Sequence, residues 1–176
     1  IITFDDGKFN PFYNDYSNDQ IDWTIWRGPT TTISTGPTGD YPSGEYFYAY
    51  IEGSSPNYPS KTANLIGRFV ANEITSFEFY YHMYSSVFDV INVYPDYKLD
   101  VFIQYLIDDE NDDYTGDKIT IFSRTGNQGD KWHRFSSLIN PGIFEITFSA
   151  TTSSADDGFQ GDIAIDHITF GSAYEF

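Results

Sequence analysis

Apolar and polar residues alternate along several short segments of the chain, which is the pattern of β-strands with one face against a hydrophobic core. The clearest segment is 76–84, in which Phe77, Phe79, Tyr81 and Met83 occupy every second position. We therefore expect this segment to form a strand whose apolar side chains lie in the core.

The same alternation recurs along most of the sequence. No segment combines a sustained period of 3.6 residues with helix-capping residues. Many short strands separated by turns rich in Gly and Pro are typical of a β-sandwich or a barrel. The pattern predicts strands at residues 1–4, 21–27, 45–52, 118–122, 132–136, 144–150 and 161–170, with one or two more between 88 and 106.

Three segments between the predicted strands lack this period. Residues 8–20 carry Asn, Asp, Pro and aromatic residues, and residues 28–44 are rich in Gly, Pro and Thr. We expect the first segment to be a loop and the second to be a long ordered loop. The acidic sequence DDENDDYTGD at residues 108–117 predicts a third loop.

The composition is that of one folded domain spanning residues 1–176. The chain is 40% hydrophobic and 19% aromatic, which is sufficient for a substantial core. It contains no cysteine, which excludes disulfides and thiolate metal sites. Because the sequence begins with a strand-like segment, we expect a domain excised from a larger secreted protein.

The charge of the chain narrows the range of partners. The formal net charge is −17, with only 9 Lys and Arg residues. Such a surface repels nucleic acids and anionic membranes. We expect cations, neutral ligands or basic ligands instead.

Two acidic residues, Asp162 and Asp166, lie in the predicted closing strand. Alternation places Asp166 and Ile168 on the face opposite Ile163 and Ile165. A carboxylate among apolar neighbours is costly to bury unless it is paired or bound to a metal ion. Asp166 is therefore our first candidate for a buried ionic site.

Six stretches, in order and with approximately the expected spacing, resemble the MAM domain, which is named for meprin and the receptor tyrosine phosphatase mu. They cover nearly the whole chain. The stretches are IDWTIWRG (21–28), TGPTGDYPSGEYFYAYIEGSS (35–55), FEFYYHMYSS (77–86), SRTGNQGDKWHRF (123–135), FEITFSAT (144–151) and GDIAIDHITF (161–170).

The resemblance implies an all-β jelly-roll sandwich of two antiparallel sheets. It also implies an extracellular, non-catalytic domain used for adhesion or recognition. The chain departs from the family in lacking its four typical cysteines and in a segment at about residues 85–98 that resembles an insertion. We interpret the absence of the cysteines, together with a composition rich in Asp, Asn and Tyr, as favouring a secreted or surface protein of a bacterium.

Domains that this chain resembles often bind Ca²⁺ where the first and last strands meet. Asp5 and Asp6 follow the first predicted strand, Asp40 follows a Gly-rich loop, and Asp166 lies in the last strand. Carboxylates and main-chain carbonyl groups are the oxygen ligands that Ca²⁺ prefers. We predict a structural Ca²⁺ held by these four residues, with the alternative that they are ordinary turn and loop-edge acids.

The acidic loop offers Asp109, Asn111 and Asp113 at the spacing of an EF-hand. However, Tyr114 replaces the Gly of that loop, Thr120 replaces its bidentate Glu, and no helix flanks it. We interpret the segment as a solvated acidic loop.

Aromatic residues on the strand faces opposite the predicted core are candidates for ligand binding. Rings with polar tips suit stacking against sugars, because they offer flat apolar area and lose little entropy. The alternative is that cross-strand tyrosine pairs stabilise the sheet or that loops cover them. The candidate residues are Tyr46, Tyr48, Tyr50, Tyr80, His82, Tyr84 and Trp26.

The other aromatic residues are ranked lower as ligand contacts. Trp23 and Trp132 fall within family-like motifs, and we predict that both belong to the core. Phe12, Tyr13 and Tyr16 in the first loop are secondary candidates for ligand contact.

The sequence contains no catalytic motif of the common hydrolase, phosphate-binding or dinucleotide-binding classes. We therefore predict a non-catalytic module that binds a polysaccharide, preferably a neutral glycan, and tethers a secreted enzyme to it. The alternative is a module for protein–protein or cell adhesion, which is the usual role of the resembled family. Localisation would be secreted or at the cell surface.

Overall fold

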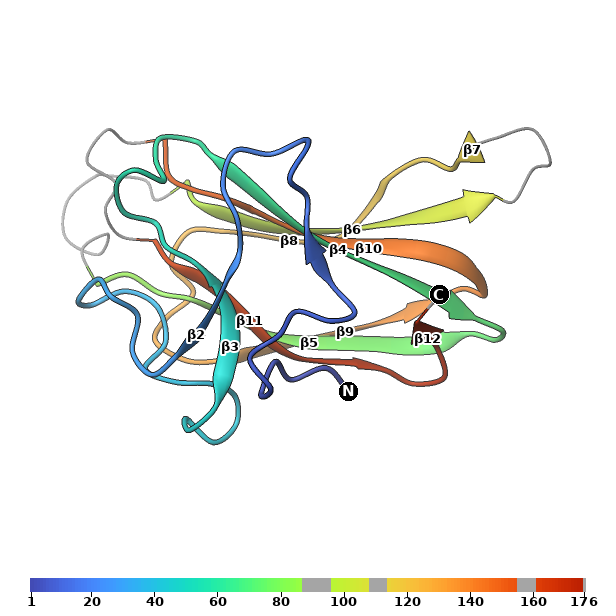
Figure 1. Cartoon of the computed structure of the whole chain (residues 1–176), viewed down its shortest axis with the longest axis horizontal. Coiled ribbons are helices and arrows are strands. Elements are labelled where there is room, and N and C mark those ends of the chain that lie inside the picture. Colours follow the sequence, from blue (N-terminus) through green and yellow to red (C-terminus); the bar gives the residue numbers. More distant parts are fainter. Residues whose placement is uncertain (87–95, 108–113, 155–160, 176) are drawn as a thin grey trace.

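The computed structural model describes residues 1–86, 96–107, 114–154 and 161–175, which form strands, turns and loops without a helix. The strands make two antiparallel sheets, which stack face to face as a jelly-roll sandwich (Figure 1). The predicted fold class is confirmed. Within these ranges no helix has the length and hydrophobicity to cross a membrane.

The larger sheet has seven strands, with the main order β1-β4-β10-β6-β7. At its edges, β12 also pairs with β4 and β8 also pairs with β6. Its strands are β1 (Tyr13–Asn14), β4 (Thr62–Ala71), β6 (Lys98–Ile107), β7 (Tyr114–Thr115), β8 (Ile119–Thr125), β10 (Gly142–Thr151) and β12 (Tyr174–Glu175).

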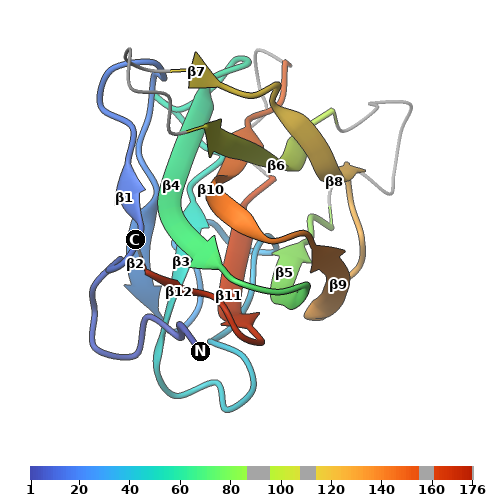
Figure 2. The same ribbon diagram turned by 90° about the vertical axis from the view of Figure 1, so that its right-hand side faces the viewer.

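The smaller sheet has five strands in the order β2-β3-β11-β5-β9. Its central strand is the closing strand of the sequence, and the view in Figure 2 shows this sheet packed against the larger one. Its strands are β2 (Thr24–Arg27), β3 (Phe47–Ile51), β5 (Thr75–Met83), β9 (His133–Ile139) and β11 (Ile163–Phe170).

The core lies between the sheets and consists largely of aromatic rings. Phe148 in β10 contacts the rings of Phe12, Phe77 and Phe79, at centroid distances of 5.6, 6.3 and 5.0 Å. Trp23 is also buried in this core, as predicted. Aromatic pairs stabilise such a core beyond the burial of their area.

The closing strand departs from the predicted alternation after Asp166. The pairing of β11 with β5 shifts register between Asp166 and Thr169, and His167 has a φ of 50°. This bulge inserts an extra residue, so that Ile168 lies in the core together with Ile163 and Ile165. The predicted position of Ile168 on the opposite face is therefore wrong.

Three of the short strands fall within segments that we predicted to be loops or left unassigned, namely β1, β7 and β12. Conversely, the predicted first strand at residues 1–4 forms only an isolated bridge between Ile2 and Ile168. Such short pairings lack enough residues for a hydrophobic period. The predicted strand around 88–95 and the acid-rich segment 108–113 lie outside the described residues.

Candidate functional site

Part of the outer side of the smaller sheet, on which we predicted a ligand platform, is covered. Tyr48, Tyr50 and Ala164 are buried there, and Trp26 and Trp132 pack against them as a second apolar cluster. Tyr48 contacts the rings of Tyr50 and Trp132 at centroid distances of 6.1 and 6.0 Å. The expectation that Tyr48 and Tyr50 face a ligand is therefore wrong, because these rings form a covered aromatic layer.

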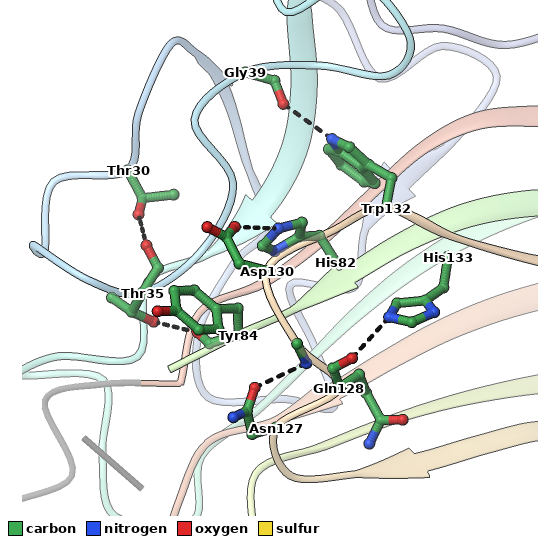
Figure 3. Close-up of polar contacts among 11 residues, drawn as sticks. Thr30, Thr35, Gly39, His82, Tyr84, Asn127, Gln128, Asp130, Trp132 and His133 are labelled. Carbon is green, nitrogen blue, oxygen red and sulfur yellow. Dashed lines mark hydrogen bonds and ion pairs between the residues drawn. The ribbon is translucent and has the colours of Figure 1, made fainter. Parts of the chain in front are cut away.

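The polar atoms of this aromatic layer hold the loop that covers it. The Tyr48 hydroxyl donates to the Gly28 carbonyl at 2.6 Å, and Trp26 Nε1 donates to the Pro29 carbonyl at 2.8 Å. Trp132 Nε1 donates to the Gly39 carbonyl at 3.1 Å (Figure 3). Trp132 thus lies half-buried in this layer and not in the main core, and Trp26 is also half-buried.

The remaining predicted ligand residues do not form one surface. Tyr46 is 50% exposed, while Tyr80 stacks on Tyr41 with ring centroids 3.6 Å apart. His82 is buried, and Tyr84 is half-buried at the end of β5. Tyr46 and Tyr80 therefore do not belong to the covered layer. Tyr84, another of the predicted ligand residues, lies beside an open cavity.

This cavity has a volume of about 380 Å³ and lies between the loop of residues 29–38 and the end of β5. Tyr84 and Asp130 line it, together with Pro29, Pro37 and several Thr and Ser residues of the loop. The Thr35 hydroxyl donates to the Tyr84 carbonyl at 2.9 Å and thereby fixes the loop to the strand (Figure 3).

Asp130 is held by a buried histidine. His82 Nε2 lies 3.2 Å from Asp130 Oδ1, and Figure 3 shows the two side chains facing each other. Burial lowers the pKa of His82 to about 4, although the charge of Asp130 acts in the opposite direction. At neutral pH we assign the proton to Nε2, because Nδ1 is buried without a hydrogen-bond partner in the described part of the chain. The neutral imidazole of His82 therefore does not offset the charge of the Asp130 carboxylate.

The predicted metal ligand Asp166 is fully buried in β11. Its two carboxyl oxygens accept hydrogen bonds from the main-chain N–H groups of Tyr41, at 2.9 Å, and His167, at 2.7 Å. Burial raises the pKa of Asp166 to about 8 despite these bonds, and the charges of Asp40 and Asp5 add to the increase. Asp5 and Asp40 are therefore near enough to Asp166 to act on it electrostatically.

The four side chains that we predicted to bind Ca²⁺ do not all face one site. Asp40 is buried and accepts hydrogen bonds from Ser43 and from the Tyr46 N–H. Asp6 is exposed, and its carboxylate faces Lys8 instead. Among the described residues, no three His, Asp or Glu side chains form a cluster that could hold a metal ion. A cation beside Asp166 would therefore require main-chain oxygens as well.

A second buried acid lies at the start of β11. Asp162 is fully buried and accepts a hydrogen bond from the Gly53 N–H at 2.8 Å. Burial, and then the charge of Glu52, raises the pKa of Asp162 to about 7. Burial also favours a higher pKa for Glu52, but hydrogen bonds from Thr31, Ser54 and Thr32 outweigh it and leave that pKa lowered.

The outward-facing side of the larger sheet carries a surface that we did not predict. Its side chains alternate with core residues along β4, β6 and β10. At its centre, Thr147, Ser149 and Asp100 are only 3%, 8% and 8% exposed although they point away from the core. We call this surface the outer face; its residues include Thr62, Asn64, Ile66, Arg68, Val70, Lys98, Asp100, Phe102, Gln104, Ile143, Glu145, Thr147, Ser149 and Thr151.

Strand pairing arranges the outer face in rows. One row runs from Tyr13 through Ile66 and Thr147 to Phe102. Burial, followed by the charge of Glu145, raises the pKa of Tyr13, which also interacts with Arg68, so its ring belongs to this face. Tyr13 was among the secondary candidates from the sequence. The burial of Thr147 and Ser149 had no sequence signal, because Thr and Ser are common on any wet strand face.

The sequence model of the MAM domain family, described as meprin/A5/mu, matches residues 2–174. The MAM domain-containing glycosylphosphatidylinositol anchor protein 2 of mouse is 31% identical over 182 residues, which cover 94% of this chain. The human protein of the same name gives the same values. The chain therefore belongs to the MAM family. It spans 17% of the length of these relatives, which are animal proteins, and a bacterial origin stays a prediction.

Solved structures confirm the fold at low sequence identity. The structure of TmCBM61 in complex with β-1,4-galactotriose matches with a TM-score of 0.54 and 12% identity, covering 99% of this chain and 94% of that one. The K2 cleaved adhesin domain of Lys-gingipain matches with a TM-score of 0.58 and 14% identity, covering 96% and 95%. These likenesses define a shared sandwich architecture.

Proposed function

We propose that this chain is a non-catalytic binding module that holds a neutral polysaccharide on the outer face of the larger sheet. The observation that carries the proposal is the row of side chains on this face that runs from Tyr13 through Ile66 and Thr147 to Phe102. Tyr13 and Phe102 would stack against sugar rings, while the half-buried polar side chains of this face would bind sugar hydroxyls.

The row from Tyr13 to Phe102 has dimensions that suit an oligosaccharide. The two residues are separated by three strand spacings, because β4 and β10 lie between their strands. At about 4.8 Å for each spacing, the backbones of the two residues stand about 14 Å apart. A chain of a few sugars lying across the strands would contact both rings and the side chain of Ile66 between them.

The charged residues that β4, β6 and β10 place on the outer face form two ion pairs, whereas Lys118 lies over the Phe102 ring, 5.3 Å from its centroid. Arg68 Nε lies 3.1 Å from Glu145 Oε2, and Lys98 Nζ lies 2.6 Å from Asp100 Oδ2. Such pairs offer donors and acceptors to hydroxyl groups without attracting an ionic polymer. Together with the net charge of −17, they favour a neutral glycan over an acidic one.

The similar proteins and structures support the proposed class, which is a binding module. A domain of the same fold has been described with galactotriose bound. The animal relatives are named as glycosylphosphatidylinositol-anchored proteins, which supports a secreted or cell-surface location. A module of this kind would raise the local concentration of a tethered partner at a polysaccharide.

The test is a glycan array followed by calorimetric titration of the best neutral ligand. We expect Phe102→Ala and Tyr13→Ala each to weaken binding about 10- to 30-fold, as aromatic contacts at the centre of an interface do. Tyr16→Ala is the matched control, because Tyr16 is exposed and lies outside the outer face. Unchanged affinity in both face variants would exclude this surface, and the absence of any glycan ligand would exclude the function.

Protein adhesion is the second candidate, favoured by membership of the MAM family. Leu138 in the edge strand β9 is exposed, and Ile74 beside the start of β5 is exposed as well. Exposed apolar side chains on an edge strand can contact another protein. Sedimentation velocity over a range of concentrations would detect self-association, and Leu138→Lys should abolish it if this edge is the contact.

We also propose a structural Ca²⁺ beside Asp166. The buried carboxyl group, the neighbouring charges of Asp5 and Asp40, and the raised pKa support this proposal, since a cation would relieve the repulsion. Asp166 and Asp40 would contribute carboxyl oxygens and Asp5 a further one. Asp6 does not fit, because its side chain is directed to Lys8.

A further inference from the structure

The cavity beside Tyr84 has a different chemical character from the outer face. The charged residue among its lining residues is Asp130, and no Lys or Arg lines it. Pro29, Pro37 and Ile33 supply apolar surface, and the side chain of Ile33 is 86% exposed at the edge of the loop. An aromatic ring, an apolar edge and one carboxylate thus surround the same space.

The carboxylate of Asp130 is oriented but not neutralised. Its Oδ1 receives the hydrogen bond from His82, which fixes the side chain at the mouth of the cavity. Because His82 is neutral at physiological pH, the pair carries a net charge of −1. The Asp130 side chain is 57% exposed, so it remains accessible to a ligand.

Further acids lie behind the loop that lines the cavity. Thr32 lines it and donates to the Glu52 carboxylate at 3.0 Å, and Thr31 also donates to that carboxylate. Asp162 lies against Gly36 and donates its N–H to Thr35 Oγ1 at 3.0 Å. Lys131 is the nearby basic residue in sequence, but it does not line the cavity. The ionisable groups named behind the loop are thus acidic, although Asp162, whose pKa is raised to about 7, is only partly ionised at neutral pH.

From these observations we propose that the cavity binds a lysine or arginine side chain of a basic segment in a partner protein. The cationic group would lie between Asp130 and the ring of Tyr84, where ion-pair and cation–π attraction act together. The aliphatic stem of the side chain would pack on Ile33 and the two prolines, as long basic side chains do on apolar surface. That apolar edge favours a protein side chain over an amino sugar, whose ring carries hydroxyl groups.

This interaction is independent of glycan binding, because the two surfaces lie on different sheets. The cavity is formed at the end of β5 in the smaller sheet, whereas the outer face belongs to the larger sheet. The module could therefore hold a glycan and a basic partner at the same time.

The experiment titrates the ¹⁵N-labelled domain with a short lysine-rich peptide while its amide spectrum is recorded. We expect shifts at Tyr84, Asp130 and residues 30–36, and binding that weakens as salt is added. Asp130→Asn should weaken binding about fivefold, which is the upper range for one exposed ion pair. Asparagine retains an oxygen that can accept the His82 hydrogen bond, so this variant tests the charge alone.

Three further measurements test whether the cavity binds a basic side chain or another ligand. The same peptide with acetylated lysines should not bind, and Glu175→Gln, which removes an exposed acid of β12, should bind like the native domain. Equal binding of the acetylated peptide, equal affinity in Asp130→Asn, or no shift at Tyr84 would each overturn the proposal. Binding of a glucosamine oligomer in place of the peptide would also overturn it by identifying an amino sugar as the occupant.

Discussion

The buried carboxyl group of Asp166 accepts the main-chain N–H of Tyr41 at 2.9 Å, although the two residues are 125 positions apart in the sequence. This bond joins the closing strand to the loop of residues 28–44. The same loop covers the aromatic layer through Gly28, Pro29 and Gly39. One ionisable group therefore lies at the base of the segment that shapes the cavity and covers the smaller sheet.

The ionisation of Asp166 and Asp162 makes stability depend on pH. Their pKa values are about 8 and about 7 in the folded state, against about 3.9 in an unfolded chain. Between these limits the folded state holds more protons, so the free energy of unfolding falls as pH rises from about 4 to 8. The maximum slope is about 1.4 kcal/mol per pH unit for each group. Chemical unfolding at several pH values in EDTA measures it.

Calcium should reverse that dependence if it binds at Asp166. A bound cation stabilises the ionised carboxylate, so added Ca²⁺ should raise the unfolding midpoint most strongly near pH 8. Asp166→Asn should abolish the response, whereas Asp6→Asn should retain it. A native midpoint that is insensitive to Ca²⁺ at every pH would remove the ion from the proposed function.

His82 should produce a pH dependence of the opposite sign. Its pKa is about 4 when folded and about 6.5 when unfolded, so the unfolded state holds more protons within that interval. The stabilising contribution is present above pH 6.5 and is lost as pH falls towards 4. His82→Gln, which can still donate to Asp130, lacks this loss, so its free energy of unfolding should increase relative to that of the native domain as pH falls from 6.5 to about 4. Parallel curves for the two proteins would contradict the neutral buried state of His82.

The aromatic core should tolerate truncation poorly at its centre. Phe148 is fully buried among Phe12, Phe77 and Phe79. We expect Phe148→Ala to lower the free energy of unfolding by about 3–5 kcal/mol through lost contacts and a cavity. Leu138→Ala, at an exposed position, should change it by less than about 0.5 kcal/mol. Denaturant titration of both variants makes the comparison.

The Asn14 side chain should contribute more to stability than its short strand suggests. Its Oδ1 accepts the Trp23 N–H at 2.8 Å, and its Nδ2 donates to the Trp23 carbonyl at 3.1 Å. It thus supplies both hydrogen bonds to the buried backbone where the first loop reaches the smaller sheet. Asn14→Ala would leave both groups unsatisfied, and we expect a loss of about 1–3 kcal/mol for each. A loss comparable with that of an exposed Asn variant would contradict this role.

Much of the architecture could be predicted from local pattern. Alternation over Phe77, Phe79, Tyr81 and Met83 is a property of consecutive residues, and the structure buries all four. The co-linear motifs likewise predicted the jelly roll. Burial of aromatic area drives folding wherever two apolar strand faces can meet. The sequence alone therefore determined the strands, the sandwich and, for most strand residues, whether the side chain faces the core.

The candidate sites depended on contacts between distant segments. Tyr48 and Tyr50 alternate in the same way whether a loop covers them or water does, and only the position of residues 28–44 decided that they are buried. The bulge after Asp166, the burial of Thr147 and the meeting of Tyr84 with Asp130 were also decided by tertiary structure. Alternation specifies which face a side chain takes, whereas exposure and charge at a site depend on which remote segments come to lie against it.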